Sequence, residues 1–267
     1  MAPTKFSRLI PLSLALSLGL AIPVSASIAS KEAAPVRLGN SFGGEIPNGT
    51  LNAYDPPGDL DLPGRREGGG TRGNHCAYNR LTALVPNAQA TEENSVSVYG
   101  ATAADAPTLY FYLEANAEAQ SSVETTPEIE FVLQKVEGGD IDASAPENIY
   151  IDRFEAPAAS GILEYTIDPS KLNESLEMGE FYVWYFSVIC EPADRSNDLF
   201  TSGWLQRTDV SVDGLNPEQR QQAYRDAAVW YDALAEAKAM GATEQWTTLL
   251  EQVGLGEYAN ASIISAR

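Results

Sequence analysis

The most informative segment of the sequence is LEMGEFYVWYFSVIC, residues 176–190. Alternate residues of a strand point to opposite faces. In a strand over 181–190 one face would carry Tyr182, Trp184, Phe186, Val188 and Cys190, and the other Phe181, Val183, Tyr185 and Ile189. Both faces are apolar, so we expect one to fill the core of a β-sandwich and the other to lie under a lid.

The start of this segment has the spacing L-x-x-G-x-x-Y, formed by Leu176, Gly179 and Tyr182, with Trp184 two residues further on. The spacing resembles the tyrosine corner of fibronectin type III and immunoglobulin-like sandwiches, in which the Tyr hydroxyl bonds back to the preceding backbone. Gly179, Tyr182 and Trp184 are therefore expected to be structural residues.

Short strands separated by turns are predicted over residues 76–212. Apolar alternation or short apolar runs mark them. They fall at 81–85, 96–98, 109–113, 129–133, 149–154, 162–167, 181–190 and 204–210. The strands on either side of EAPAASG, 155–161, are predicted to form a hairpin. Seven or eight such strands favour an immunoglobulin- or fibronectin III-like β-sandwich.

A C-terminal helical element is predicted over 216–265. Asn216 is a suitable N-cap and Pro217 a suitable first residue for a helix that continues to Gly241. A second helix is predicted from a Thr243 cap to Gly254, and a third short one over 257–265. Each helix has only one apolar side, so we expect the two or three helices to pack on the sandwich and supply its lid.

Residues 1–29 have the features of a signal peptide. Lys5 and Arg8 precede an apolar stretch, 9–24, and VSA or SIA offers a cleavage site. An uncleaved anchor is the alternative, but the stretch is short and contains two prolines and a glycine. We expect an exported protein without stable membrane insertion after cleavage. Residues 30–75 follow as a Gly/Pro-rich irregular arm, part of which could pack as an extended edge.

The two cysteines, Cys76 and Cys190, both lie beyond the predicted cleavage site. An even pair in an oxidising compartment indicates a disulfide. The alternative is a catalytic thiol with His75 as its base. Neighbouring strand residues point to opposite faces, so His75 is badly placed for that role.

The charge balance is strongly acidic, with 17 Lys+Arg against 37 Asp+Glu and a formal net charge of −20. Such a surface repels phosphate backbones, so no nucleic-acid partner is expected.

Catalytic and cofactor motifs are incomplete. GGGTRG, 68–73, lacks the strand and helix of a dinucleotide site, and DLDLPG and DIDASA lack the ligands of an EF-hand. With a single His the sequence offers neither a Ser-His-Asp triad nor a His-based zinc site. A calcium site in the acidic loops and a catalytic pair of carboxylates stay as alternatives. We therefore predict no cofactor and lean against an enzyme.

Several stretches resemble a cyanobacterial family of exported proteins catalogued as a domain of unknown function. They include GGGTRGNHC, LTALVP, APTLYFYL, EIEFVL, LEMGEFYVWYFSVIC, SNDLFTSGW with Arg207, and WTTLLEQVGL, and they extend over about 68–255. The resemblance implies export, the disulfide and strands followed by helices. It implies no activity, so no catalytic residue follows from it.

The sequence thus predicts a non-catalytic binding or scaffolding component of the periplasm or cell surface, with an envelope protein or a glycan as partner. Arg72, Asp194, Asp198 and Trp204 are the candidate contact residues. One alternative is a carboxylate-dependent hydrolase of envelope or extracellular polysaccharide, which requires two acids in a cleft. The other is a carbohydrate-binding module, which requires exposed coplanar aromatic rings.

Overall fold

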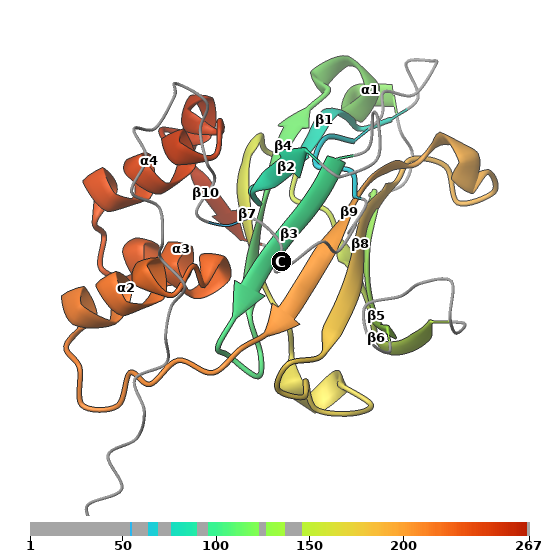
Figure 1. Cartoon of the computed structure of the whole chain (residues 1–267). Helices are drawn as coiled ribbons and strands as arrows, with labels where there is room; N and C mark the ends of the chain where they lie inside the picture. The colour runs from blue at the N-terminus through green and yellow to red at the C-terminus, as the bar shows by residue number, and fades with distance from the viewer. Residues whose placement is uncertain are drawn as a thin grey trace, which may run out of the picture. The chain divides into compact units, whose positions relative to one another are not determined.

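Two β-sheets and a group of C-terminal helices make up the computed structural model (Figure 1). It describes Tyr54 and residues 64–68, 76–89, 96–122, 127–136 and 146–265. All of these belong to one unit, Asn48–Arg267. The predicted signal peptide, most of the predicted arm, Arg72 and His75 lie outside the described residues. No helix of the described part is long and apolar enough to cross a bilayer.

The strands begin and end as follows: β1 Tyr78–Ala83, β2 Asn87–Gln89, β3 Val96–Thr102, β4 Thr108–Ala115, β5 Glu128–Val136, β6 Glu147–Glu155, β7 Gly161–Thr166, β8 Phe181–Ile189, β9 Leu199–Arg207 and β10 Ile263–Ser265. The helices are α1 Ala117–Ser122, α2 Pro217–Asp226, α3 Trp230–Ala239 and α4 Thr243–Gln252, with short 3-10 turns at η2 Pro169–Lys171, η3 Arg195–Asn197 and η4 Gly256–Tyr258.

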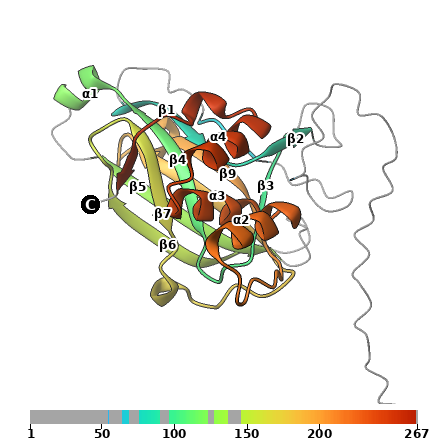
Figure 2. The same cartoon turned by 90° about the vertical axis from the view of Figure 1, so that its left-hand side faces the viewer.

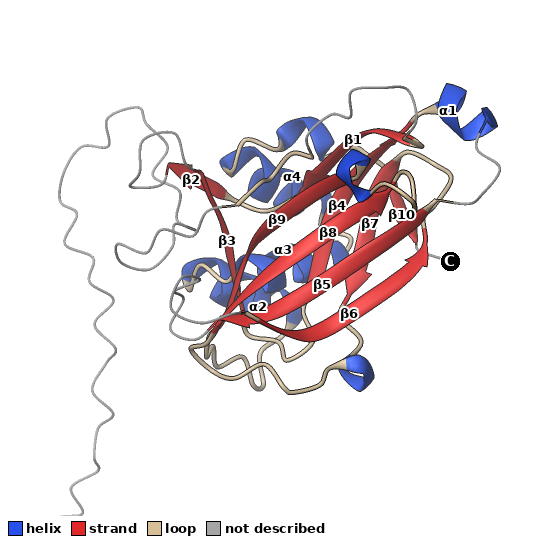
Figure 3. Ribbon diagram, turned by 90° about the vertical axis from the view of Figure 1, so that its right-hand side faces the viewer, coloured by secondary structure: helices blue, strands red, loops and turns tan. Residues whose placement is uncertain are grey.

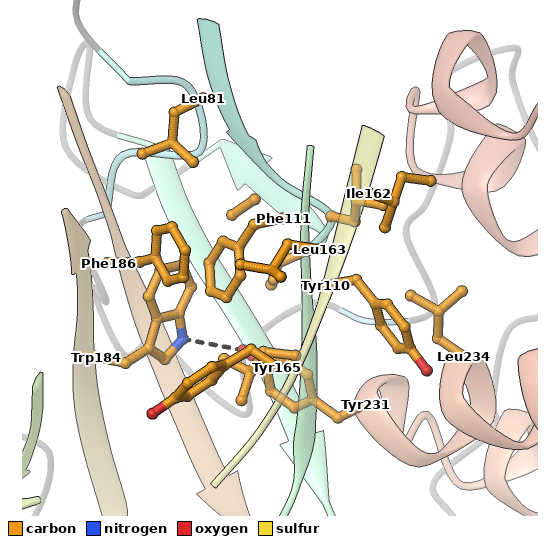
Figure 4. Packing of buried hydrophobic residues seen from close by; sticks show 14 of the residues in the cluster. Leu81, Tyr110, Phe111, Ile162, Leu163, Tyr165, Trp184, Phe186, Tyr231 and Leu234 are labelled. Atoms are coloured by element: carbon orange, nitrogen blue, oxygen red, sulfur yellow. Dashed lines mark hydrogen bonds between the residues drawn. The ribbon is translucent and has the colours of Figure 1, made fainter. Parts of the chain in front are cut away.

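One sheet has four strands in the order β1-β4-β7-β10, and the other has six in the order β2-β3-β9-β8-β5-β6. Strand pairs are antiparallel except β3–β9 and β7–β10, which are parallel. The sheets pack face to face: the rings of Phe111 on β4 and Phe186 on β8 stack with centroids 3.8 Å apart (Figure 4). Apart from α1 and β10, the strands precede the helices along the chain, as predicted.

Strand β8 lies inside the six-stranded sheet, between β5 and β9. Tyr182, Trp184 and Phe186 point into the space between the sheets and are fully buried. The backbone N–H of Glu177 donates a hydrogen bond to the Tyr182 hydroxyl (2.7 Å). Gly179 lies in the intervening turn with φ +84°, a left-handed conformation that glycine adopts without strain.

A disulfide joins Cys76, just before β1, to Cys190, just after β8, as predicted. It links the four-stranded sheet to the six-stranded sheet and closes a loop with a sequence separation of 114 residues.

One short part of the predicted arm, residues 64–68, joins the two sheets along their edge. Arg65 pairs with Ser202 on β9, while Glu67 pairs with Thr82 on β1. Because the backbone of this segment is extended, its N–H and C=O groups form hydrogen bonds with β9 on one side and with β1 on the other. This part of the arm therefore packs as an extended edge segment of the two sheets.

The helices form a third layer on the outer face of the four-stranded sheet (Figure 2). Trp246 on α4 packs edge-on against Tyr110 on β4, with ring centroids 5.3 Å apart. Lys238 on α3 forms an ion pair with Glu164 on β7. The prediction that the helices cover the second face of β8 is therefore wrong, because the apolar side of the helices meets Tyr110 and its neighbours instead.

The predicted hairpin over 149–167 is also wrong. Strand β6 pairs with β5 in the larger sheet, and β7 pairs with β4 in the smaller one. Side chains, not backbone bonds, connect β6 and β7: Phe154 stacks on Tyr165 at 5.4 Å, and the Tyr165 hydroxyl donates to that of Tyr150 at 3.0 Å. The connecting segment therefore crosses from one sheet to the other.

The C-terminal helices differ from the prediction at three points. The first helix is broken into α2 and α3 at Ala228, which has φ +56°. The N-cap of α4 is Ala242, not Thr243. The predicted third helix is replaced by η4 and by β10, which extends the four-stranded sheet beside β7. At the start of α2, by contrast, Asn216 caps the helix in a capping box with Gln219.

The start of one strand, an additional strand and an additional helix also differ from the prediction. The last strand of the larger sheet, β9, begins five residues before the predicted Trp204. Strand β2 and helix α1 were not anticipated from the sequence.

Candidate binding surface

The outer face of the six-stranded sheet, whose strands Figure 3 shows, carries a group of exposed and half-buried apolar side chains, which we call the apolar strip. It consists of Ile151 on β6, Val132 on β5, Tyr185 on β8 and Phe200 on β9. Ile151 is 54% exposed, Tyr185 37% and Phe200 36%, while Val132 is half-buried.

The strand register places Ile151, Val132 and Tyr185 directly side by side and Phe200 diagonally next to Tyr185. Val132 pairs directly with Ile151 on one side and with Tyr185 on the other. Tyr185 in turn pairs with Ser202, and Phe200 lies two residues before Ser202 on the same face of β9. Single exposed apolar residues are normal on protein surfaces, so it is the grouping of these residues on neighbouring strands that makes this face a candidate contact surface.

Arginine side chains border the strip on one side. Glu130 accepts bonds from both Arg153 and Arg195, and Arg195 also binds Asp198. The carboxylates are the inner members, with side-chain exposures of 15% for Glu130 and 6% for Asp198. The arginines are the outer members, 54% and 40% exposed, so this part of an acidic protein presents guanidinium groups to the solvent.

The electrostatics of this network favour its charged form. Burial tends to raise the pKa of Glu130, but hydrogen bonds from Arg195 and Arg153 outweigh it and lower the pKa. Burial tends to lower the pKa of Arg195, but Asp198 and Glu130 raise it. Two carboxylates therefore hold the two guanidinium groups in place, and the four groups balance one another in charge.

A third arginine touches the strip itself. The guanidinium group of Arg65 lies over the ring of Phe200, 4.6 Å from its centroid, in cation–π geometry. The pairing of Arg65 with Ser202 places it there, so the edge segment 64–68 also builds one end of the surface.

The four predicted contact residues do not form one site. Trp204 is 1% exposed and lies in a buried cluster with Tyr99 and Val183, where it stabilises the sheet. Asp194 is exposed and caps η3 through the backbone N–H and hydroxyl of Ser196. Asp198 accepts from the backbone N–H of Cys190 (3.1 Å) and holds the loop between β8 and β9. Arg72 lies outside the described residues.

The carboxyl group with the clearest catalytic signature, a pKa raised by burial, has a structural role. Asp232 on α3 accepts bonds from the Thr102 hydroxyl (2.7 Å) and the Ala103 backbone N–H (2.9 Å). These bonds tie α3 to the end of β3. Among the described residues, no group of three His, Cys, Asp or Glu is arranged to hold a metal ion.

Sequence reasoning missed the strip because it assigned Tyr185 to a face under a lid. The signal was present: Ile151 and Val132 lie outward in strands whose other outward residues are polar or charged, such as Arg153 and Glu130.

These features define a two-sheet β protein with a C-terminal helical layer and an exposed apolar strip on the opposite side. The chain belongs to the family described as Domain of Unknown Function (DUF928), whose model matches residues 67–263. A search of the curated proteins finds no match to the chain.

Proposed function

We propose that this protein is a non-catalytic binding or scaffolding component of the periplasm or cell surface that docks a partner protein on the apolar strip. The observation that carries the proposal is the exposure of Ile151, Tyr185 and Phe200 on one face of the six-stranded sheet, with arginine side chains beside them. Tyr and Arg are the residue types that most often dominate binding energy at protein interfaces.

The chemistry of the strip favours a protein over a glycan. Its most exposed member is Ile151, and aliphatic side chains pack against other apolar side chains but offer no platform for sugar rings. The border supplies exposed guanidinium groups: Arg65 lies over Phe200, and Arg153 and Arg195 keep further N–H donors beyond those bound to Glu130 and Asp198, so carboxylates of a partner can accept from them. The partner is therefore a protein whose apolar face is edged by Asp or Glu.

An immunoglobulin-like arrangement of the strands is part of the same proposal. The core strands in chain order are β1, β4, β5, β6, β7, β8 and β9, and they divide into β1-β4-β7 and β9-β8-β5-β6. This division matches strands A-B-E against G-F-C-C′ of immunoglobulin domains. The bond from the Glu177 backbone to Tyr182, at the start of the strand in the F position, also supports it.

Export is supported by two features. The predicted signal peptide at 1–29 directs a chain out of the cytoplasm. The Cys76–Cys190 disulfide is the kind of bond that persists in an oxidising compartment.

The test is photo-crosslinking in the native cell, with a photoreactive phenylalanine derivative at position 185. A matched control carries the same derivative in place of Gln252, which is exposed at the end of α4 in the helical layer. We expect a discrete protein adduct from position 185 and not from 252.

A second variant shows whether the strip itself is responsible. Ile151→Asp replaces a 54% exposed strand residue by a poor strand former, so we expect a loss of stability of about 1 kcal/mol, which leaves the protein folded. It should abolish the adduct from position 185. Capture of glycan alone, no adduct, or equal adducts from both positions would contradict the proposal.

A further inference from the structure

A concave site lies in the helical layer, away from the apolar strip. It is a pocket of about 180 Å³ between α3, α4 and β10. Its walls include Ala237 and Lys238 on α3, Ala242 and Trp246 at the start of α4, and Ala261 and Ile263 near β10.

The pocket exists because small side chains meet around one large ring. Alanines from three different segments leave space that a larger residue would fill. Trp246 is 6% exposed and is held by its edge-on contact with Tyr110, so this wall is rigid. Ile263, 41% exposed, stands at the rim. An apolar cavity of about 150 Å³ accommodates benzene, so this pocket has room for a body of that size with a small head group.

One charged side chain, that of Lys238, indicates which class of ligand the pocket favours. Lys238 lines the pocket, and its ammonium group is fixed by Glu164 Oε2 at 2.5 Å. Glu164 Oε1 in turn accepts from the Tyr110 hydroxyl at 3.2 Å. An ammonium group has three N–H donors, and the bond to Glu164 uses one of them. The others are suited to an oxygen acceptor on a bound molecule.

We propose that this pocket binds a compact apolar carboxylate, with the hydrocarbon body against Trp246 and the alanines and the carboxylate at Lys238. Ligand sites of this kind combine apolar walls with a few fixed polar groups that orient the ligand. The site lies on the opposite layer from the apolar strip, so its occupancy does not depend on the proposed partner.

The test uses benzoate as the probe and follows the NMR signals of the Ala242 and Ile263 methyl groups in the full, oxidised chain. Benzyl alcohol and benzylamine serve as neutral and cationic analogues of the same body. We expect saturable shifts with benzoate, weaker binding of benzyl alcohol and the weakest binding of benzylamine. Lys238→Met should weaken benzoate about five- to tenfold and leave benzyl alcohol unchanged.

A pair of matched alanine variants separates the pocket from the general surface. Ala242→Leu fills the pocket and should abolish binding of all three probes. Ala239→Leu adds the same side chain at an exposed position of α3 outside the pocket and should leave binding intact. Absence of saturable shifts with benzoate, benzylamine binding more tightly than benzoate, or benzoate binding unchanged in Ala242→Leu would overturn the proposal.

Discussion

The indole N–H of Trp184, between the two sheets, donates a hydrogen bond to the hydroxyl of Tyr231 on α3 at 3.0 Å. The Tyr231 hydroxyl donates in turn to the backbone carbonyl of Trp204 at 3.3 Å. Both Trp184 and Tyr231 are buried. The first turn of α3 therefore reaches into the sandwich and joins the helical layer to the six-stranded sheet (Figure 4).

Removal of this hydroxyl is expected to destabilise the whole fold. Tyr231→Phe keeps the ring but leaves the buried indole N–H of Trp184 without its acceptor, which costs about 1–3 kcal/mol. Urea unfolding measures the change. Tyr224→Phe, on the half-buried side of α2, is the control and should change stability by less than about 0.5 kcal/mol. Equal effects of the two substitutions would contradict this role of Tyr231.

The close approach of Tyr231 to β3 leads to a second prediction. A Cβ atom at Gly100 would lie 2.7 Å from Tyr231 Cε2, so Gly100→Ala forces the ring to move. We expect a loss of about 1–3 kcal/mol. In a Tyr231→Leu background the same alanine should cost less, because the clashing ring is gone. Additive effects in this double-mutant cycle would show that the contact is not the cause.

The disulfide is expected to make a large contribution to stability. With a separation of 114 residues, the bond between Cys76 and Cys190 restricts the unfolded chain, and its loss costs about 4–5 kcal/mol in the chain-entropy treatment. Guanidinium unfolding of the oxidised protein and of Cys76→Ser/Cys190→Ser measures the difference. A double variant as stable as the oxidised protein would refute this prediction.

The Glu130 network predicts a specific pH dependence. The pKa of Glu130 is lower in the folded chain than its ordinary value of 4.5. Its contribution to stability is therefore present above that value and is lost as the pH falls through the folded-state pKa. Glu130→Gln should cost about 1 kcal/mol at neutral pH, a modest figure because both arginines are partly exposed.

The cost of Glu130→Gln should shrink as the pH falls from 4.5 through the lower folded-state pKa, because the wild-type carboxylate then becomes protonated as well. Glu128→Gln, an exposed position two residues earlier on the same face of β5, serves as the control. A cost of Glu130→Gln that is the same at neutral and acidic pH would show that charge is not responsible.

Local patterns in the sequence were sufficient to predict most strands and the paired cysteines. Alternation identified β5 and β8, and the aromatic face of β8 that was expected to fill the core lies between the two sheets. The start of α2 could be predicted because Asn216 and Pro217 act within one turn of the chain.

The remaining features depend on contacts between distant segments. The strands that carry Phe154 and Tyr165 are separated by a turn-rich segment, which is the pattern of a hairpin. In the structure each strand pairs in a different sheet, and no local signal distinguishes these two arrangements. Ala228 has no residue-type signature of the left-handed break that separates α2 from α3. The apolar strip arises from the register of four strands, which alternation within any one strand does not specify.

Hydroxyl-radical footprinting of the protein in its native envelope, compared with the purified protein, tests the proposed binding surface most directly. Tyr185 and Phe200 are partly exposed aromatic rings, whereas Tyr182 is buried and serves as an internal reference. We predict that Tyr185 and Phe200 are modified in the purified protein and protected in the envelope, with no change at Tyr182. Equal modification of Tyr185 and Phe200 in both samples would contradict a partner on the apolar strip.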